Sequence, residues 1–508
     1  MLGALTDYHS VMNKLSGFLY TGTQIGTIER RAADIADLDS WTLMQRAGQC
    51  AFQLLQAKWP KARSMTVWCG AGNNGGDGYV VASLAAQVGW AVEVIALGEP
   101  STQPAGRALQ EATRHSVSIR SSLTASSPQG TVLVDALLGT GLARAPEGDF
   151  RAAIECMNEQ ARPVVSLDLP SGLNSDSGGA PGVAVSADLT VTFVGMKLGL
   201  QTGRGPDLCG SLVLDRLGLP GGAYDAVQSV ARLIEGDSVA RLLPPRPAGL
   251  HKGGAGHVLV LGGAEGMSGA ARICAAGAFR VGAGLVTLAT HSSHAAIANI
   301  EMPELMVQAV GERSSLVRLF SGKRALVVGP GLGQGAWGRD LFAACLEQSM
   351  PRVIDADALN RLADEPAKGA DWVLTPHSGE AARLLGCSIA EVEADRPSAV
   401  IEIRKRYGGV CVLKGVGTLV AVADGSVWLC DRGNPGMASA GMGDLLAGVI
   451  GGLLAQGLSA SQAACAGVWL HASAGDLAAG EYPRGLVARD LLESLRRLVN
   501  RSCDVDDQ

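Results

Sequence analysis

Short apolar runs, each followed by a glycine-rich or polar loop and often by a helical pattern, recur along the chain. Because these runs are apolar almost throughout, we expect them to form strands of parallel sheets that helices cover on both faces. Two amphipathic helices are predicted between Ile25 and Gln56, and a third from Tyr79 to Val88. In the first half the predicted strands are residues 65–69, 91–97, 131–135, 164–168, 189–194 and 211–215.

The second half repeats the pattern after a stretch without strand character. Between Gly218 and Arg246 the sequence gathers proline and glycine, which predicts a domain boundary near residue 235. Residues 251–270 then have the pattern of a strand, a glycine loop and a helix. The later predicted strands are 285–289, 325–329, 352–355, 372–375, 410–414, 418–422 and 426–430. The expected divisions are an N-terminal extension of unassigned structure at 1–20 and domains at 21–234 and 235–508.

Polar side chains gather where the strands of the first half end. Residues 70–78, GAGNNGGDG, put two asparagines and an aspartate between a strand and the helix predicted to follow it. Asp135 and Asp168 end two further strands, and Ser171 follows the second of them. Because the carboxyl ends of parallel strands meet at one edge of a sheet, these side chains predict a ligand site. The alternative is that they only form Asx-turns and a helix cap.

The same loop also contains the GxGxxG spacing of NAD dehydrogenases, at Gly70, Gly72 and Gly75. That fingerprint requires an acidic residue at the end of the next strand. The candidate, Glu93, lies inside the strand predicted at 91–97, with four apolar residues still to follow it. An ordinary dehydrogenase is therefore the weaker interpretation.

A second glycine-rich loop, from Gly433 to Gly448, runs directly into a helix near the end of the chain. Unpaired N–H groups and the helix dipole meet at such a junction, so it can bind an anion such as a phosphate. Asp444 stands at this point, either as a simple N-cap or as a carboxylate with a chemical role. The buried face of the predicted helix comprises Leu445, Leu446, Val449, Ile450, Leu453 and Leu454.

Composition narrows the functional class. With 508 residues, 47% of them apolar and 18% charged, the chain predicts two to four domains of a globular α/β protein. A formal net charge of -6 without basic runs argues against nucleic acid as a partner. Eleven cysteines without a CxxC pair suit reduced thiols, so we expect a cytoplasmic protein. No apolar run is long enough to predict a membrane span, and we interpret His291 and His294 as surface residues rather than zinc ligands.

Several motifs, in their order along the chain, resemble a known family. GAGNNGGDG, VDALLGTG and LDLPSG are similar to the NAD(P)H-hydrate epimerase domain. HKGGAGHVLVLGG, GPGLG, DADAL, LTPHSGE, LKGVGT and GNPGMASAGMGD are similar to the ADP-dependent NAD(P)H-hydrate dehydratase domain. The order of the two sets resembles that of the bifunctional NAD(P)H-hydrate repair enzymes of bacteria. The resemblance weakens over residues 1–20, in the linker and after about residue 490.

This resemblance implies an N-terminal Rossmann-like three-layer αβα sandwich followed by a C-terminal ribokinase-like αβα domain. The first domain would interconvert the R and S forms of hydrated NADH and NADPH (NADHX and NADPHX) at C6 of the nicotinamide ring. The second would remove water from the S form at the expense of ADP, with Mg²⁺. The resemblance also implies a potassium ion in the first domain, and we expect a homo-oligomer that has no nucleic-acid or membrane partner.

The resemblance assigns roles to particular residues. Asp168 and Asp444 would be catalytic and would contact the hydrate, and Asn74, Asp135 and Ser171 would bind potassium. The remaining hydrate contacts would be Asn73, Asn74, Gly75, Gly76, Asp77, Gly139, Thr140, Gly141, Leu142, Ala143, Arg144, Ala145, Ala270, Gly333 and His377. The nucleotide contacts would be Lys414, Gly415, Val416, Gly417, Thr418 and Gly443.

Two other interpretations stay open at this point. A ribokinase-like small-molecule kinase fused to a dinucleotide-binding module would use the GMGD loop for the same electrostatic work on a transferred phosphate. A non-catalytic nucleotide-binding protein would need neither Asp168 nor Asp444. Assays with ATP and sugars or vitamin precursors, against ADP and NADHX, test the first possibility, and an epimerase assay on R-NADHX tests the second.

Overall fold

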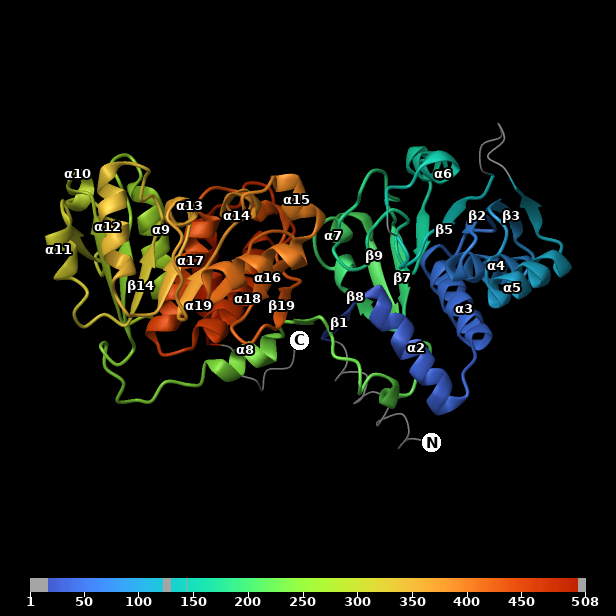
Figure 1. The fold of residues 1–508 in the computed structure, drawn as a ribbon, viewed down its shortest axis with the longest axis horizontal. Helices are drawn as coiled ribbons and strands as arrows, with labels where there is room; N and C mark the ends of the chain where they lie inside the picture. The colour runs from blue at the N-terminus through green and yellow to red at the C-terminus, as the bar shows by residue number, and fades with distance from the viewer. Residues whose placement is uncertain (1–16, 122–128, 143, 501–508) are drawn as a thin grey trace. The chain divides into compact units, whose positions relative to one another are not determined.

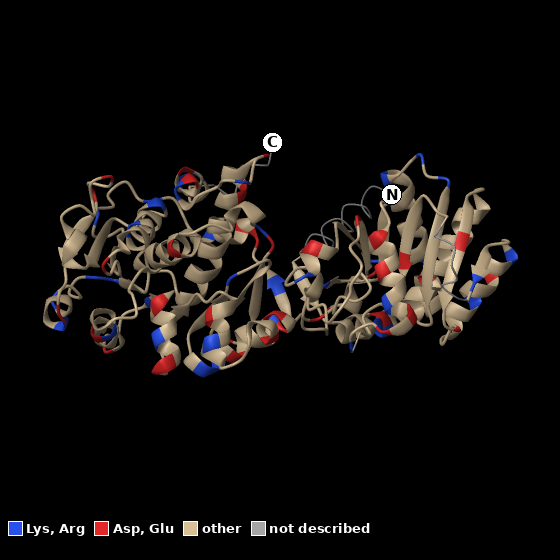
Figure 2. Cartoon of the chain, turned by 90° about the horizontal axis from the view of Figure 1, so that it is seen from above, with Lys and Arg blue, Asp and Glu red and all other residues tan. Residues whose placement is uncertain are grey.

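The computed structural model describes residues 17–121, 129–142 and 144–500, and the chain divides into two compact units between Arg232 and Leu233. Each unit contains a largely parallel sheet with helices packed against it (Figure 1). In both units acidic and basic side chains are interspersed, as Figure 2 shows. No helix of the described part is long and apolar enough to cross a membrane.

The sheet of unit 1 has seven parallel strands in the order β4-β3-β2-β5-β6-β7-β9. The strands are β2 (Ser64–Gly70), β3 (Ala91–Leu97), β4 (Ser118–Arg120), β5 (Val132–Ala136), β6 (Val164–Leu167), β7 (Leu189–Phe193) and β9 (Ser211–Asp215). The helices are α2 (Gly22–Ala36), α3 (Ser40–Lys58), α4 (Asn73–Gln87), α5 (Gln103–Arg114), α6 (Gly148–Glu159) and α7 (Gly205–Leu208).

Successive strand residues point into two different cores, which makes unit 1 a three-layer sandwich. Val67 packs in the core formed with α2, α3, α4 and α5, whereas its neighbour Trp68 packs in the core that contains Ile154 and Met157 of α6. The side chains of a strand alternate between faces, so a strand that is apolar at every position can serve both cores. The six strands predicted in the first half are confirmed as strands, although β9 at the edge of the sheet is only partly buried.

Three short strands extend unit 1: β1 (Phe18–Tyr20), β8 (Met196–Lys197) and β10 (Ala231–Leu233). Strand β1 pairs in parallel with β8 and antiparallel with β10. Leu19 is fully buried, so the last residues of the segment predicted as an extension belong to the fold. Residues 1–16 lie outside the described residues.

Helix α4 begins earlier than the sequence pattern predicts. It starts at Asn73, with Gly72 as its N-cap, so the polar residues of 70–78 lie mainly in the first turns of a helix rather than in a loop. The glycines explain the difference, because a Cβ on Gly75 would lie 1.9 Å from the Gly70 carbonyl oxygen. A Cβ on Gly78 would lie 2.6 Å from the Cβ of Ala136 in β5. These glycines let the helix pack directly onto the strands.

In unit 2 the strands follow the order β13-β12-β11-β14-β15-β16-β17-β18-β19. They are parallel from β13 to β17, and β18 pairs antiparallel with both β17 and β19. The strands are β11 (His257–Leu261), β12 (Leu285–Thr290), β13 (Met306–Ala309), β14 (Ala325–Val328), β15 (Arg352–Ile354), β16 (Trp372–Leu374), β17 (Val410–Leu413), β18 (Thr418–Ala421) and β19 (Val427–Cys430). The helices are α8 (Gly236–Leu242), α9 (Ser268–Arg280), α10 (Ser292–Ala295), α11 (Arg313–Val317), α12 (Ala336–Leu346), α13 (Asp357–Asp364), α14 (Ser378–Leu385), α15 (Ile389–Ala394), α16 (Arg396–Tyr407), α17 (Met442–Ala455), α18 (Ala460–Ala479) and α19 (Leu491–Leu498).

Helix α17 lies in the core of unit 2, with all six apolar residues of its predicted face buried. Glycines allow its close approach to its neighbours. A Cβ on Gly448 would lie 1.8 Å from the carbonyl oxygen of Cys274 in α9, and a Cβ on Gly451 would lie 2.2 Å from a methyl group of Val327 in β14. Contacts along the whole of α17 thus fix the position of its first turn.

We predict that Gly448→Ala lowers the free energy of unfolding of unit 2 by about 1–3 kcal/mol, because α17 must move away from α9. The matched control is Gly269→Ala, a helical position in α9 with nothing within 4 Å of the added Cβ. The control should be neutral or stabilising by up to about 1 kcal/mol. Differential scanning calorimetry of both variants tests this, and equal effects would contradict the packing argument.

Candidate functional sites

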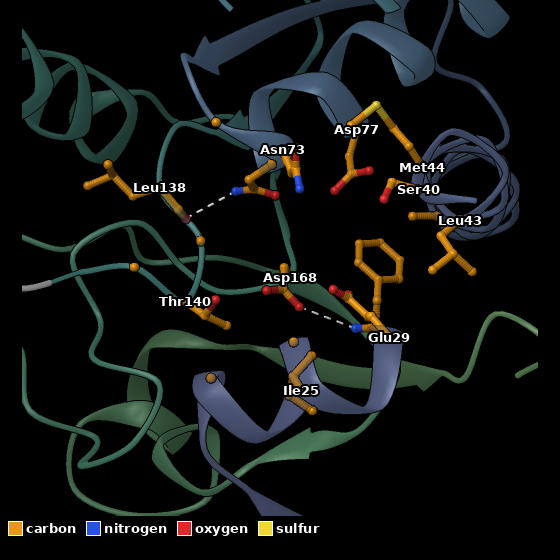
Figure 3. A pocket seen from close by; sticks show the side chains of 18 of the residues that line it. Ile25, Glu29, Ser40, Leu43, Met44, Asn73, Asp77, Leu138, Thr140 and Asp168 are labelled. Atoms are coloured by element: carbon orange, nitrogen blue, oxygen red, sulfur yellow. Dashed lines mark hydrogen bonds between the residues drawn. The ribbon is translucent and has the colours of Figure 1, made fainter. Parts of the chain in front are cut away.

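A cavity of about 640 Å³ opens at the carboxyl edge of the unit 1 sheet (Figure 3). Side chains from α2, α3 and the start of α4 line it, together with the loops after β5 and β6. The predicted hydrate-contacting residues in its lining are Asn73, Asn74, Asp77, Gly139, Thr140, Gly141, Leu142 and Asp168. The structure therefore brings most of the predicted set together around one hollow.

Five other residues predicted to contact the hydrate are not among the described residues that line this cavity. Among the described residues the cavity lining does not include Gly75, Gly76, Arg144 or Ala145, and Ala143 lies outside the described residues. A Cβ on Gly76 would lie 2.4 Å from the Cε of Met44, and Gly75 faces the strand backbone. The two glycines thus allow the close packing of α4, and their contact with the hydrate stays a prediction.

Asp168 follows β6 in an unusual backbone conformation, with a φ of 65°. Its carboxylate accepts hydrogen bonds from the Lys197 ammonium group, from the Thr192 hydroxyl at 3.3 Å and from the Phe193 N–H at 3.3 Å. Lys197 is fully buried and also donates to the Phe193 carbonyl oxygen at 2.8 Å. The strand-end carboxylate is therefore held by a buried cation while its side chain faces the cavity.

Two further carboxyl groups face the same cavity in Figure 3. Burial raises the pKa of Asp77 well above its ordinary value, and the charges of Asp168 and Glu29 add to the rise while Lys197 opposes it. Burial also raises the pKa of Glu29, which Lys197 opposes. The cavity thus combines one carboxyl group paired with a lysine and two whose pKa is raised by burial.

The three predicted potassium ligands lie together beside this cavity. The Ser171 hydroxyl donates to Asp135 at 2.5 Å and accepts from the Leu138 N–H at 2.9 Å. The Asn74 side-chain N–H donates to the Leu138 carbonyl oxygen at 3.0 Å. The Asn74 amide oxygen is buried and has no hydrogen-bond partner. A buried oxygen without a partner destabilises the fold, so a bound cation or hydrogen-bond donor at the Asn74 amide oxygen would be favourable.

The site of unit 2 centres on Lys414, which follows β17. Its ammonium group donates to Asp355 at 2.9 Å and lies 3.7 Å from a carboxylate oxygen of Glu380. Burial alone would lower the pKa of Lys414, but Asp355 and Glu380 outweigh burial and raise it. Burial raises the pKa of Glu380, and Lys414 opposes this. The two carboxylates therefore stabilise the charged form of Lys414, and Lys414 in turn stabilises the charged form of Glu380.

Asp444 is the third residue of α17, and it does not cap the helix. The N-cap is Gly441, with a φ of 90° and no side-chain hydrogen bond, so the simple capping role considered from sequence is not observed. Burial raises the pKa of Asp444 to about 6, the charge of Asp355 adds to the rise, and Lys414 opposes it. A Cβ on Gly443 would lie 3.2 Å from the Lys414 ammonium nitrogen. Lysine and helix N-terminus therefore face each other.

The predicted nucleotide loop is a turn between β17 and β18. Gly415 has a φ of 141°, and Arg396 donates to the Lys414 carbonyl oxygen at 3.1 Å. The Thr418 hydroxyl donates to the Gly415 carbonyl oxygen at 2.9 Å. Val416 is half exposed, at 51% of its surface. The turn also includes Gly417. Arg396 thus stabilises the base of the turn, at Lys414, while Val416 at its tip is exposed and accessible to a ligand.

The three remaining predicted hydrate contacts of unit 2 occupy nearby loops. The backbone N–H of His377 donates to Glu380 at 2.8 Å, and Glu380 in turn faces Lys414. The Gly333 N–H donates to Asp357 at 2.8 Å, and Asp357 contributes to the raised pKa of Asp444. Ala270, at the start of α9, packs beside the loop that contains Gly333.

Several residues of both sites were missed from sequence. Asp355 lies in the motif DADAL and Glu380 in LTPHSGE. The sequence indicated both motifs but did not show which of their residues belong to the site. Glu29 and Lys197 lie outside any polar loop, so only the tertiary structure reveals them. The surface interpretation of His294 is wrong, because this side chain is buried and bonds the Gly263 carbonyl oxygen at 2.7 Å.

Comparisons with known proteins match both units. A family model described as NAD(P)H-hydrate dehydratase matches residues 258–497, and one described as YjeF-related protein N-terminus matches residues 40–199. A bifunctional NAD(P)H-hydrate repair enzyme of Coxiella burnetii is 47% identical, over 95% of this chain and 99% of its own. The Escherichia coli relative of the same name is 43% identical, over 93% of this chain and 92% of its own. The solved ADP/ATP-dependent NAD(P)H-hydrate dehydratase of Bacillus subtilis is 30% identical, over 52% of this chain and 96% of its own, with a TM-score of 0.47.

A Rossmann-like unit followed by a ribokinase-like unit, each with a lysine among carboxylates at the edge of its sheet, defines a two-domain α/β enzyme, as the sequence predicted. The chain belongs to the family of bifunctional NAD(P)H-hydrate repair enzymes. It combines an NAD(P)H-hydrate epimerase with an NAD(P)H-hydrate dehydratase.

We predict that Asp444→Asn stabilises unit 2. Because the pKa of Asp444 is about 6 in the fold against an ordinary value of 3.8, its ionised form opposes folding above pH 6. The variant should gain about 1–3 kcal/mol at about pH 8. The gain should shrink as the pH falls through 6, because the carboxyl group then becomes neutral in the fold. Calorimetry of both proteins between about pH 4 and 8 checks this, and a gain independent of pH would contradict it.

Proposed function

We propose that unit 1 interconverts the R and S hydrates of NADH and NADPH in the cavity around Asp168, and that unit 2 dehydrates the S form with ADP between Lys414 and α17. The observation that carries the proposal is the facing arrangement of Lys414, Gly443 and Asp444 at a helix N-terminus. Such a site attracts a phosphoryl group and offers a base beside it.

Dehydration requires a hydroxyl group to become a better leaving group, which phosphorylation achieves. Asp444, with a pKa of about 6, is mostly ionised at neutral pH and can accept the proton of the hydrate hydroxyl. The N–H groups at the start of α17 and the Lys414 ammonium group would stabilise charge on the transferring phosphoryl group. The turn from Lys414 to Thr418 would hold the adenine nucleotide.

A divalent ion such as Mg²⁺ would supply positive charge that neutralises the phosphates of the nucleotide. Within the described residues no group of three or more His, Cys, Asp or Glu side chains is arranged to hold a metal by itself. Mg²⁺ commonly binds through one or two carboxylates together with substrate phosphates. Asp355 fits this role, because one of its carboxylate oxygens is buried without a hydrogen-bond partner.

A potassium ion fits the cluster beside the cavity of unit 1. The unpaired amide oxygen of Asn74, the Asp135 carboxylate, the Ser171 hydroxyl and the Leu138 carbonyl supply the oxygen ligands that such an ion requires. When bound, the ion would neutralise local charge and fix the loops that carry these residues. The protein side chains themselves would then hold the hydrate against Asp168.

We predict that Asp444→Asn lowers the dehydration rate of S-NADHX by ~10²- to 10⁴-fold, since the variant lacks a general base. Epimerisation of R-NADHX by the same protein should be unchanged and serves as the internal control. Recovery of NADH absorbance with ADP and Mg²⁺ measures the first activity. Near-normal dehydration by the variant would remove Asp444 from the mechanism.

We predict that the epimerase activity depends on K⁺, and that Asn74→Ala raises the K⁺ concentration for half-maximal rate by about tenfold or more. The matched control is Asn73→Ala, because Asn73 also lines the cavity but its amide oxygen already accepts from Thr102 at 2.7 Å. Titration of the epimerisation rate with KCl compares the two variants. An equal response of both to K⁺ would exclude Asn74 as a ligand.

A further inference from the structure

The cavity of unit 1 contains more acid and base groups than one catalytic carboxylate requires. Three carboxyl groups, those of Glu29, Asp77 and Asp168, face it together with the single buried ammonium group of Lys197. They come from α2, α4, the end of β6 and β8, so the fold assembles them from four separate elements. Figure 3 shows Asp77 and Asp168 on different sides of the hollow.

The two aspartates have different surroundings. Asp168 is paired with Lys197 and accepts two further hydrogen bonds, from the Thr192 hydroxyl and the Phe193 N–H. Among the described residues no side chain forms a hydrogen bond or ion pair with the Asp77 carboxyl group. The charged or titratable groups that act on it are Asp168, Glu29 and Lys197, and it lies near the Cys69 thiol. Like charges and burial therefore favour its neutral form.

We propose that Asp77 is the general acid of epimerisation and works across the cavity from Asp168, the general base. This inference rests on the proposed function of unit 1 and adds a second catalytic residue to it. Two carboxyl groups in contrasting environments, one paired with a buried lysine and one without a side-chain partner among the described residues, form the pattern that distinguishes base from acid in other enzymes.

The chemistry of the hydrate needs both groups. Carbon C6 carries a hydroxyl group and the ring nitrogen, so its C–O bond breaks when the hydroxyl oxygen receives a proton from Asp77. Water leaves, and the nitrogen lone pair forms a double bond to C6. A water molecule then attacks C6 from the other face while Asp168 takes its proton, and the electron pair returns to nitrogen.

The step is balanced in atoms and protons. One water is released and one is consumed, nothing is oxidised or reduced, and one proton passes from Asp77 to Asp168. Exchange with solvent returns the proton to Asp77 before the next turnover. In the reverse direction the two aspartates exchange roles, as microscopic reversibility requires.

The test is the pH dependence of kcat/KM for the conversion of R-NADHX to S-NADHX, measured on the full chain. The wild-type profile should fall at high pH, because Asp77 then loses the proton that it must donate. Asp77→Asn should lower the rate by ~10²- to 10⁴-fold and abolish the fall at high pH. Asp77→Glu, which keeps an acid on the same helix face, should retain that fall and part of the rate.

The matched control is Asp207→Asn, which removes an exposed carboxylate of α7 from the same unit. It should leave the profile unchanged, and dehydration of S-NADHX should be unchanged in all variants. A wild-type rate and an unaltered high-pH fall in Asp77→Asn would overturn the assignment of Asp77. An inactive wild-type protein would instead refute the proposed function of unit 1, so the two failures are distinguishable.

Discussion

Each unit holds one buried or nearly buried lysine among several carboxyl groups at the carboxyl edge of a parallel sheet, and the chemistry of both sites depends on that balance. Lys197 pairs with Asp168, while Lys414 pairs with Asp355 and limits the rise in the pKa of Asp444. Charges withdrawn from water are stable only when they are paired, so removal of either lysine would leave several carboxylates without compensation. The same balance leaves two acids in each site with a raised pKa, Glu29 and Asp77 in unit 1 and Glu380 and Asp444 in unit 2.

The backbone makes these clusters possible through close packing. Gly75 and Gly78 allow α4 to lie against β2 and β5, and Gly448 allows α17 to lie against α9. In both units the helix that carries a site carboxylate is therefore fixed by contacts that a larger residue would prevent. Rigid placement has a chemical purpose, because acids and bases act only when their position relative to the reacting atoms is set in advance.

The parallel strands and the polar loops at their ends could be predicted from sequence, because a run of apolar residues followed by a polar loop is visible within a short segment of the chain. Asn74, Asp135, Asp168 and Ser171 therefore entered the predicted set together, and the structure places them side by side. The start of α4 was missed because glycines and asparagines have poor helix propensity, and only the tight approach to the sheet overrides it. Glu29 and Lys197 could not be predicted, since neither belongs to a polar loop at a strand end and each acquires its role only from residues distant in sequence.

The most direct test of the account follows NADH absorbance from a mixture of the R and S hydrates with ADP, Mg²⁺ and K⁺. The wild-type chain should convert both forms completely to NADH. Asp168→Asn should recover only the S fraction, and adding the Asp444→Asn protein should restore recovery of the remainder, because each variant retains the activity that the other lacks. Recovery of the R fraction by Asp168→Asn alone would contradict a division of labour between the two lysine-centred sites.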